Sequence, residues 1–369
     1  MNQLKFSTAV LAKTAGCIVL FLLLNFSLNL GTASAQSPLP LGSVSGITQL
    51  SSCPAGYFPG ASCFVATVSC PDTLDIQVTY GLTNPDGVPR GMIALFNGAG
   101  GTQPYGGANR GHNYSTTYLQ AGYQIVQSAW ATDWENTSIA GGLNVKTAAC
   151  RPATLLNFFH QTLYQGDGGM CAQGASAGSA AVAYSLSWYG SSNYLDKVEL
   201  LSGPVLSNID EGCMVPNAPP VTVCAAGQFG CQGEPWTDKP QYVGGDQIAV
   251  GQWSGLACQQ GKQTQAAANA SWKAMSIVDP AQGPSFFYPQ TAMAGWLCSN
   301  GVNNSAAEGQ IFYRQFTTAA QTAEYSVTRI DGCSGPEGVE AGTTASGQNG
   351  FVAISSNMMD SVAGCIKRH

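Results

Sequence analysis

Residues 169–188 read GMCAQGASAGSAAVAYSLSW, and this stretch decides the fold that we expect. Its first five residues, GMCAQ, are mostly small or apolar and predict a short strand, while the Ala-rich run from 177 to 188 predicts a helix. Between them the chain reads GASAG at 174–178, the only G-x-S-x-G sequence present. Glycine two residues before and two residues after Ser176 leaves room for a sharp strand-to-helix turn, which holds the serine in a strained backbone conformation.

Strand and helix patterns alternate on both sides of this turn. Apolar or alternating runs predict strands at 75–80, 91–96, 123–129, 169–173, 197–201, 291–297 and 325–330. Apolar residues at helical spacing predict helices at 114–120, 153–164, 177–188 and 350–366. Such alternation predicts an α/β fold with a mainly parallel sheet and helices on both faces.

The chain divides into a leader and one large domain. Residues 1–35 carry two lysines, an apolar run and a final Ala-Ser-Ala, which is typical of a cleaved secretory signal peptide. Residues 36–52 are rich in Ser, Pro and Gly and predict a flexible segment. We expect an α/β domain over 53–366, in which the Pro-, Gly- and Gln-rich stretch 205–285, with four cysteines, forms a disulfide-linked insertion or cap.

Composition narrows the class of protein. Hydrophobic residues make up 44% of the 369 residues, which is enough for a large core and excludes wholesale disorder. Charged residues are only 9% and the formal net charge is −6, with no run of Lys or Arg, so we expect no nucleic-acid partner. After the leader, no stretch approaches the roughly 18 consecutive apolar residues of a membrane span, so none is expected.

The cysteines indicate an oxidising compartment. Of 13 cysteines one lies in the leader, and the even number that remains predicts up to six disulfides in a secreted, extracytoplasmic protein. No C-x-x-C pair occurs, and the three histidines, His112, His160 and His369, are not spaced as metal ligands. We therefore expect neither a metal ion nor an organic cofactor.

The loop after the strand 91–96 supplies a second chemical element. It reads NGAGGT at 97–102, and in a parallel sheet of this kind it lies beside the G-x-S-x-G turn, where its backbone N–H groups can face a developing negative charge. We expect such oxyanion donors at Gly98 or Ala99, and at Ala177, which opens the helix after the serine. A Gly-rich loop without chemistry is the alternative.

With NGAGGT and GASAG in this order, the chain resembles the α/β-hydrolase-fold serine esterases and lipases over residues 65–366. The resemblance implies an eight-stranded sheet, Ser176 as the nucleophile, and hydrolysis of a carboxylic ester through an acyl-enzyme without a cofactor. The weakly charged composition suits a small-molecule ester or an acyl group on a neutral polymer. The two motifs identify no single subfamily.

Two positions depart from the pattern of that family. The loop after the last strand, 334–345, holds no His, and the segment 299–304, where the acid is expected, holds no Asp. His112 follows the Gly-rich loop and is the only histidine that the expected topology places on the face of Ser176, so it is the candidate base. A surface histidine in a loop is the alternative.

The expected topology places some of the remaining titratable residues far from Ser176 and others on its face of the sheet. His160 lies midway along a helix that leads away from the site and His369 ends the chain, so both are expected to be remote. The candidate acid is Asp210, which follows the strand 197–201. Other carboxylates expected at the same face are those of Asp133, Glu308 and Glu337.

Two functions therefore remain open. The first is a secreted carboxylic-ester hydrolase that acts through Ser176. The second is a catalytically silent protein of the same fold that binds a ligand or protein partner in the former cleft, since a serine hydroxyl without a base is a poor nucleophile.

Overall fold

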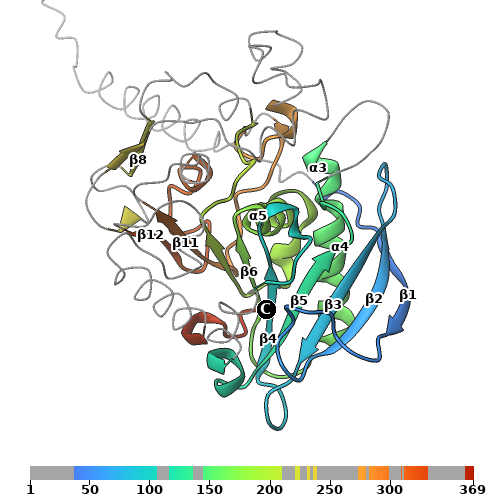
Figure 1. The fold of residues 1–369 in the computed structure, drawn as a ribbon. Helices are drawn as coiled ribbons and strands as arrows, with labels where there is room; N and C mark the ends of the chain where they lie inside the picture. The colour runs from blue at the N-terminus through green and yellow to red at the C-terminus, as the bar shows by residue number, and fades with distance from the viewer. Residues whose placement is uncertain are drawn as a thin grey trace, which may run out of the picture. The chain divides into compact units, whose positions relative to one another are not determined.

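The central strands of the sheet form where the sequence carries short, largely apolar runs. β4 (Gly91–Phe96), β6 (Met170–Ala175) and β7 (Lys197–Leu201) are buried over their whole length and pair in parallel (Figure 1). Both faces of these strands are covered, which explains the continuous apolar run of β4. β7 alternates as Lys-Val-Glu-Leu, but its Lys197 and Glu199 are buried as well.

The structure is a computed structural model that describes residues 37–105, 116–135, 144–209, 221–224, 231–232, 236–238, 273–279, 282–298, 309, 311–330 and 362–369. All of these belong to one unit of the chain, Ser37–His369. The predicted signal peptide at 1–35 lies outside the described residues.

Within the described residues, the main sheet has ten strands in the order β1-β2-β3-β5-β4-β6-β7-β11-β12-β9. Its other members are β1 (Ser43–Gln49), β2 (Ser62–Ser69), β3 (Ile76–Thr83), β5 (Tyr123–Trp130), β11 (Ala292–Cys298), β12 (Tyr325–Ile330) and β9 (Cys231–Gln232). Pairing is antiparallel from β1 to β5 and parallel from β5 onward. The eight strands from β2 to β12 have the order of an α/β-hydrolase sheet, so the predicted fold class is confirmed, and β1 and β9 extend that sheet at its edges.

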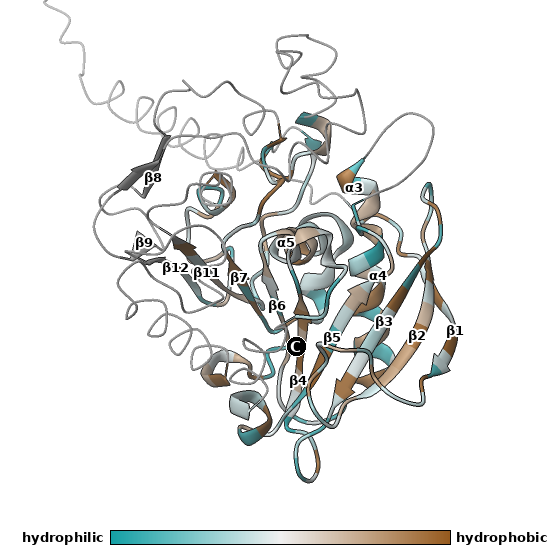
Figure 2. Cartoon of the chain, viewed as in Figure 1, coloured by the Kyte–Doolittle hydropathy of each residue, from teal (hydrophilic) through white to brown (hydrophobic). Residues whose placement is uncertain are grey.

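Helices cover both faces of the sheet. α5 (Ala177–Tyr189) and α4 (Cys150–Phe158), which continues as η2 (Phe159–Leu163) and is preceded by α3 (Val145–Ala148), pack on one face. Helical residues 116–120 and 362–364 contribute to the apolar cluster on the other face. Figure 2 shows the hydrophobic colours concentrated on the strands between these layers. Within the described part of the chain, no helix combines the length and apolarity needed to cross a membrane.

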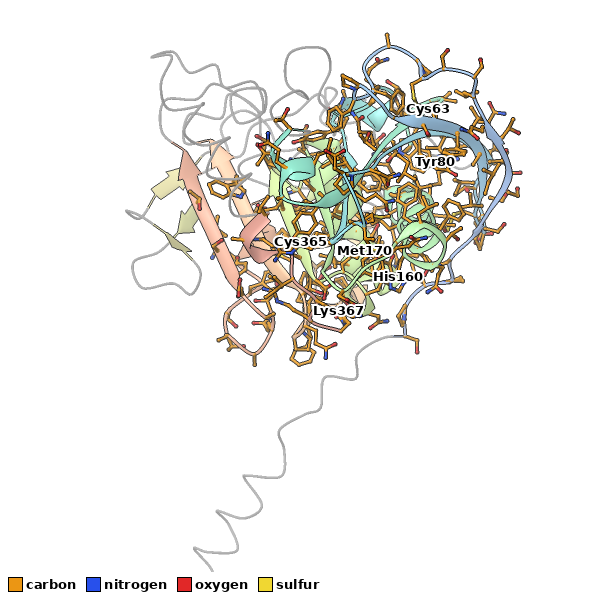
Figure 3. All side chains as sticks on the ribbon, turned by 90° about the horizontal axis from the view of Figure 1, so that it is seen from below. Cys63, Tyr80, His160, Met170, Cys365 and Lys367 are labelled. Atoms are coloured by element: carbon orange, nitrogen blue, oxygen red, sulfur yellow. A yellow bond between two sulfur atoms is a disulfide. The ribbon has the colours of Figure 1, made fainter. Side chains whose placement is uncertain are left out.

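Among the described residues three disulfides are formed, two of which join segments that are distant in sequence. Cys53–Cys63 closes the loop before β2, Cys70–Cys150 joins the end of β2 to the start of α4, and Cys171–Cys365 joins β6 to the C-terminal residues. Figure 3 labels Cys63 and Cys365, which belong to the first and third of these bonds. The prediction of structural disulfides is confirmed for these six cysteines; the side chains of the other six outside the leader lie beyond the described residues.

The segment 36–52 differs from its prediction. Residues Ser43–Gln49 form β1, which pairs antiparallel with β2, so the expectation of a flexible segment is wrong for these residues. The strand is exposed along almost its whole length, because it lies at the edge of the sheet. Its backbone hydrogen bonds to β2 hold it, and no alternation of hydrophobic side chains marks it in the sequence.

The predicted insertion 205–285 is described only in part. β8 (Val221–Cys224) and β10 (Trp236–Asp238) form a separate two-stranded antiparallel sheet there, while β9 joins the edge of the main sheet beside β12. Its role as a cap remains a prediction. The predicted final helix 350–366 is described only from 362, where a single helical turn precedes the disulfide-bonded Cys365.

Candidate active site

Ser176 occupies the turn between β6 and α5 in a conformation that is rare for a residue with a side chain. Its backbone has φ 51° and ψ −117°, and such conformations persist only where the surroundings fix them. Its N–H donates to Leu201 O at 2.9 Å, and its carbonyl accepts from the N–H groups of Ser179 and Ala180 at 2.9 and 3.2 Å. The turn is thus held from β7 on one side and from α5 on the other.

The two glycines around Ser176 are required by close backbone contacts. A Cβ on Gly174 would lie 2.2 Å from Gly178 O, and a Cβ on Gly178 would lie 2.1 Å from Phe96 O at the end of β4. Neither contact is possible for a residue with a side chain. The spacing of the G-x-S-x-G sequence therefore follows from the packing of the turn against β4 and its own helix.

The loop that follows β4 lies directly against Ser176. A Cβ on Gly98 would lie 3.0 Å from Ser176 Cβ and 3.6 Å from its Oγ. The turn continues as η1 (Ala99–Gly101), in which Ala99, Gly100 and Gly101 all have positive φ and the Gly101 N–H donates to Gly98 O at 3.0 Å. The structure thus brings together Ser176 and the predicted donor Gly98, and Ala99 is the next residue of the loop.

Ala177 contributes the other predicted donor. It is the first residue of α5, and the first N–H groups of a helix have no partner within the helix. The positive end of the helix dipole lies at the same point. Ser176 therefore lies at the start of α5, and the loop at Gly98 lies against its side chain.

Among the predicted acids, the structure describes Asp133. It lies in the loop after β5 and packs against η1, because a Cβ on Gly100 would be 2.3 Å from Asp133 Oδ1. The next residue, Trp134, donates its backbone N–H to Gly100 O at 3.0 Å. Asp210, Glu308 and Glu337 lie outside the described residues, and so does the candidate base His112.

Glu135 is a buried carboxyl that the sequence did not reveal. Its residue is 6% exposed, and burial raises its pKa to about 8. The nearby Asp133 raises it further, while a backbone hydrogen bond and Arg151 act in the opposite direction. Glu135 therefore keeps its proton at neutral pH beside the loop that contacts Ser176. No residue pattern marks this burial, since it depends on how the loop after β5 folds back.

The two described histidines lie at the opposite end of the sheet, in agreement with their place in the expected topology. His369 Nε2 lies 3.3 Å from Leu195 O, just before β7, whereas Leu201 at the other end of β7 holds Ser176. The ring of His160, labelled in Figure 3, stacks on Tyr194 at 4.7 Å. Burial lowers the pKa of His160, and nearby His369 adds to this effect. Neither histidine approaches Ser176.

Comparisons with known proteins give no family by sequence. No protein-family model and no curated protein matches the chain. Solved structures with a similar chain path include Est1E from Butyrivibrio proteoclasticus with bound ferulic acid, at 8% identity and a TM-score of 0.49, covering 81% of this chain and 98% of that one. A hyperthermophilic esterase from Pyrobaculum calidifontis has 10% identity, a TM-score of 0.48, and covers 89% and 88%. Esterase 2 of Thermogutta terrifontis, phosphoramylated by tabun, has 12% identity, a TM-score of 0.47, and covers 85% and 98%.

The fold class rests on the molecule itself. The strand order, the turn at Ser176 and the Gly-rich loop against it define an α/β-hydrolase fold. Among the described residues, no group of three His, Cys, Asp or Glu side chains is arranged to hold a metal ion.

Proposed function

We propose that the protein is a secreted serine hydrolase that cleaves carboxylic esters through an acyl-enzyme on Ser176. The observation that carries the proposal is the placement of Ser176. It has φ 51° at the start of α5, and the backbone of Gly98 lies against its side chain. A strained serine next to two sets of backbone N–H groups is the arrangement that acyl transfer requires.

The reaction follows from this geometry. Ser176 Oγ attacks the ester carbonyl carbon and gives its proton to a general base, and the carbonyl oxygen becomes an oxyanion that accepts from Ala177 N–H and from Gly98 or Ala99 N–H. Collapse of the tetrahedral intermediate breaks the bond to the alcohol, which leaves with the proton returned by the base. Water then attacks the acyl-enzyme in the same way, releasing the carboxylic acid and restoring Ser176.

We assign the role of general base to His112. We assign to Asp210 the role of the carboxylate that orients His112. The support for His112 is its place in the chain, after the loop that contacts Ser176, and the location of the two other histidines at the far end of the sheet. Asp210 follows β7, the strand whose last carbonyl binds the Ser176 N–H.

The proposed substrates are a small ester or an acyl group on a neutral polymer. The support is the chain's low content of charged residues, 9%. The mechanism needs no metal ion or organic cofactor. Secretion is supported by the signal-like leader and by three disulfides, which persist in oxidising compartments.

A second function is favoured by one observation of the sequence. The loop after β12, where serine hydrolases of this fold carry their histidine, has no His at 334–345. In this alternative the protein binds a ligand or partner at the same site without turnover.

Labelling with a fluorophosphonate probe decides between the two, because the probe reacts only with an activated serine. We expect stoichiometric labelling of the mature protein between pH 6 and 9, and its loss in Ser176→Ala. Ser185→Ala is the matched control. Ser185 is a buried serine in α5, the helix that follows Ser176, and its Oγ donates to Ala181 O. A folded wild-type protein that is not labelled would overturn the hydrolase in favour of the binding protein.

A further inference from the structure

Two glutamines are buried side by side on one face of the central sheet. Gln127 of β5 and Gln173 of β6 are both 0% exposed, and both are in register with Leu95 of β4, which lies between them. Strands in a sheet are about 4.8 Å apart, so the backbones of the two glutamines are two strands, roughly 10 Å, from each other, and their side chains lie on the same face. A buried amide is costly unless its donor and acceptor are both used.

Both amides are used to hold the same tyrosine. Gln127 Nε2 donates to Tyr105 O at 2.6 Å, and Gln173 Nε2 donates to Tyr105 Oη at 2.7 Å. Tyr105 is 2% exposed and ends the described loop that begins at Asn97 after β4. Its backbone and its side chain are thus fixed to two different strands.

The acceptor side of each amide recruits a further element. Phe58 N–H donates to Gln127 Oε1 at 2.8 Å, and Phe58 lies in the loop that the Cys53–Cys63 disulfide closes. Tyr118 Oη donates to Gln173 Oε1 at 2.5 Å. Each glutamine therefore has one partner on the loop after β4 and one partner that fixes its own rotamer.

The loop held in this way is the one that contacts Ser176. It starts at Asn97, whose Nδ2 donates to Pro104 O at 3.5 Å, so its two ends are joined. The oxyanion donors come from two separate segments: Gly98 or Ala99 on this loop, and Ala177 after β6. Their relative position depends on a connection between the loop and β6, and Gln173, three residues before Ser176 in β6, makes that connection through Tyr105.

We propose that Gln173 and Gln127 are positioning residues that set the backbone of Gly98 and Ala99 against Ser176 by fixing Tyr105. The proposal rests on the proposed hydrolase function. It assigns to these glutamines an effect on the transition state: loss of either connection lets the loop shift relative to Ala177, which weakens stabilisation of the oxyanion more than binding of the substrate.

The test compares Tyr105→Phe and Gln173→Met with the control Tyr123→Phe. Tyr123 is also buried, and its Oη donates to Cys365 O at 2.6 Å and lies 3.3 Å from Val362 O, so the control also loses the hydrogen bonding of a buried tyrosine hydroxyl, but away from the loop. With a p-nitrophenyl ester of a short acid, we expect kcat to fall about 10-fold in Tyr105→Phe and up to about 100-fold in Gln173→Met, with KM within about twofold. Fluorophosphonate labelling should slow in proportion, because the phosphoryl oxygen occupies the same donors.

The outcomes separate this inference from the proposed function. If the wild-type protein is folded and is not labelled, both are overturned. If the wild-type protein reacts and Tyr105→Phe behaves like Tyr123→Phe in kcat and labelling rate, the positioning role alone is overturned. The melting temperatures of all three variants show whether a loss of kcat comes from general destabilisation. If Gln173→Met does not fold, Tyr105→Phe, which removes a single oxygen atom, still tests the positioning role.

Discussion

Gly98 and Ser176 are in direct contact, and a Cβ on Gly98 would lie 3.0 Å from Ser176 Cβ. The contact joins the loop after β4 to the turn after β6, and it exists because both parallel strands end at the same edge of the sheet. Gly98 has φ −72° and ψ −173°, a backbone conformation that any residue adopts. The requirement for glycine at this position is therefore steric, and it comes from Ser176 and from the Ala175 carbonyl, which would lie 3.2 Å from the same Cβ.

A side chain at Gly98 should accordingly reduce activity without straining the backbone. We expect Gly98→Val to lower kcat by about 100-fold, because the loop must move away from Ser176 to accept the side chain. Gly60→Ala is the control: nothing lies within 4 Å of its Cβ, but φ is 82°, so it should lower the free energy of unfolding by about 1 kcal/mol and leave kcat unchanged. Steady-state kinetics and urea unfolding measure the two effects, and a Gly98→Val protein with wild-type kcat would contradict the site.

The assignment of the base predicts a large effect at one histidine. His112→Ala should lower kcat by roughly 10²–10⁴-fold, the usual contribution of a general base. His160→Ala and His369→Ala should leave kcat nearly unchanged, because both residues lie at the Leu195 end of β7. Activity retained in His112→Ala would reject this base and direct attention to a carboxylate such as Glu337.

Glu135 predicts a pH dependence of stability. Its folded pKa of about 8 lies above the ordinary value of 4.5, so the folded protein holds the proton that the unfolded chain loses. The contribution of Glu135 to the free energy of unfolding should therefore decrease as pH rises from about 4.5 to about 8. Above and below that window this contribution should be constant. Glu135→Gln should remove the decrease, so that it stabilises the protein at pH 8 and has little effect at pH 4.

Urea unfolding at pH 4, 6 and 8 measures this difference. The comparison is between wild type and Glu135→Gln under each condition, so that other titrating groups cancel. If the free energies of unfolding of wild type and Glu135→Gln changed equally with pH over this whole range, Glu135 would ionise normally in the folded protein.

The disulfides should differ in their contribution to stability. Cys171–Cys365 closes a sequence separation of 194 residues and Cys53–Cys63 one of only 10. Loop-closure entropy then predicts a loss of about 5 kcal/mol for the double variant Cys171→Ala, Cys365→Ala, against about 3 kcal/mol for Cys53→Ala, Cys63→Ala. Full reduction of the wild-type protein should lower the melting temperature by well over ten degrees. Equal losses in the two double variants would reject the entropic explanation.

Local sequence patterns predicted the turn at Ser176 and the strands around it. G-x-S-x-G and NGAGG are recognisable because their glycines are required. Gly100 and Gly101 have positive φ, whereas Gly98, Gly174 and Gly178 have no room for a side chain. The strands 91–96, 197–201 and 325–330 were predicted with their observed bounds. The first is a continuous apolar run, and the other two are short runs with apolar residues at alternate positions. β1 was missed, because an exposed edge strand is held by backbone hydrogen bonds, which leave no side-chain pattern.

The sequence by itself thus determined the fold class, the Ser176 turn and the loop expected beside it. Only the tertiary structure decided which polar residues are buried and what they bind. Lys197 and Glu199 pair at 3.1 Å inside β7, Gln127 and Gln173 hold Tyr105, and Glu135 keeps a proton beside Asp133. The physical reason is that tight turns and close backbone contacts require glycines, which the sequence shows directly, whereas the cost and the partners of a buried polar group depend on segments that meet only when the chain has folded.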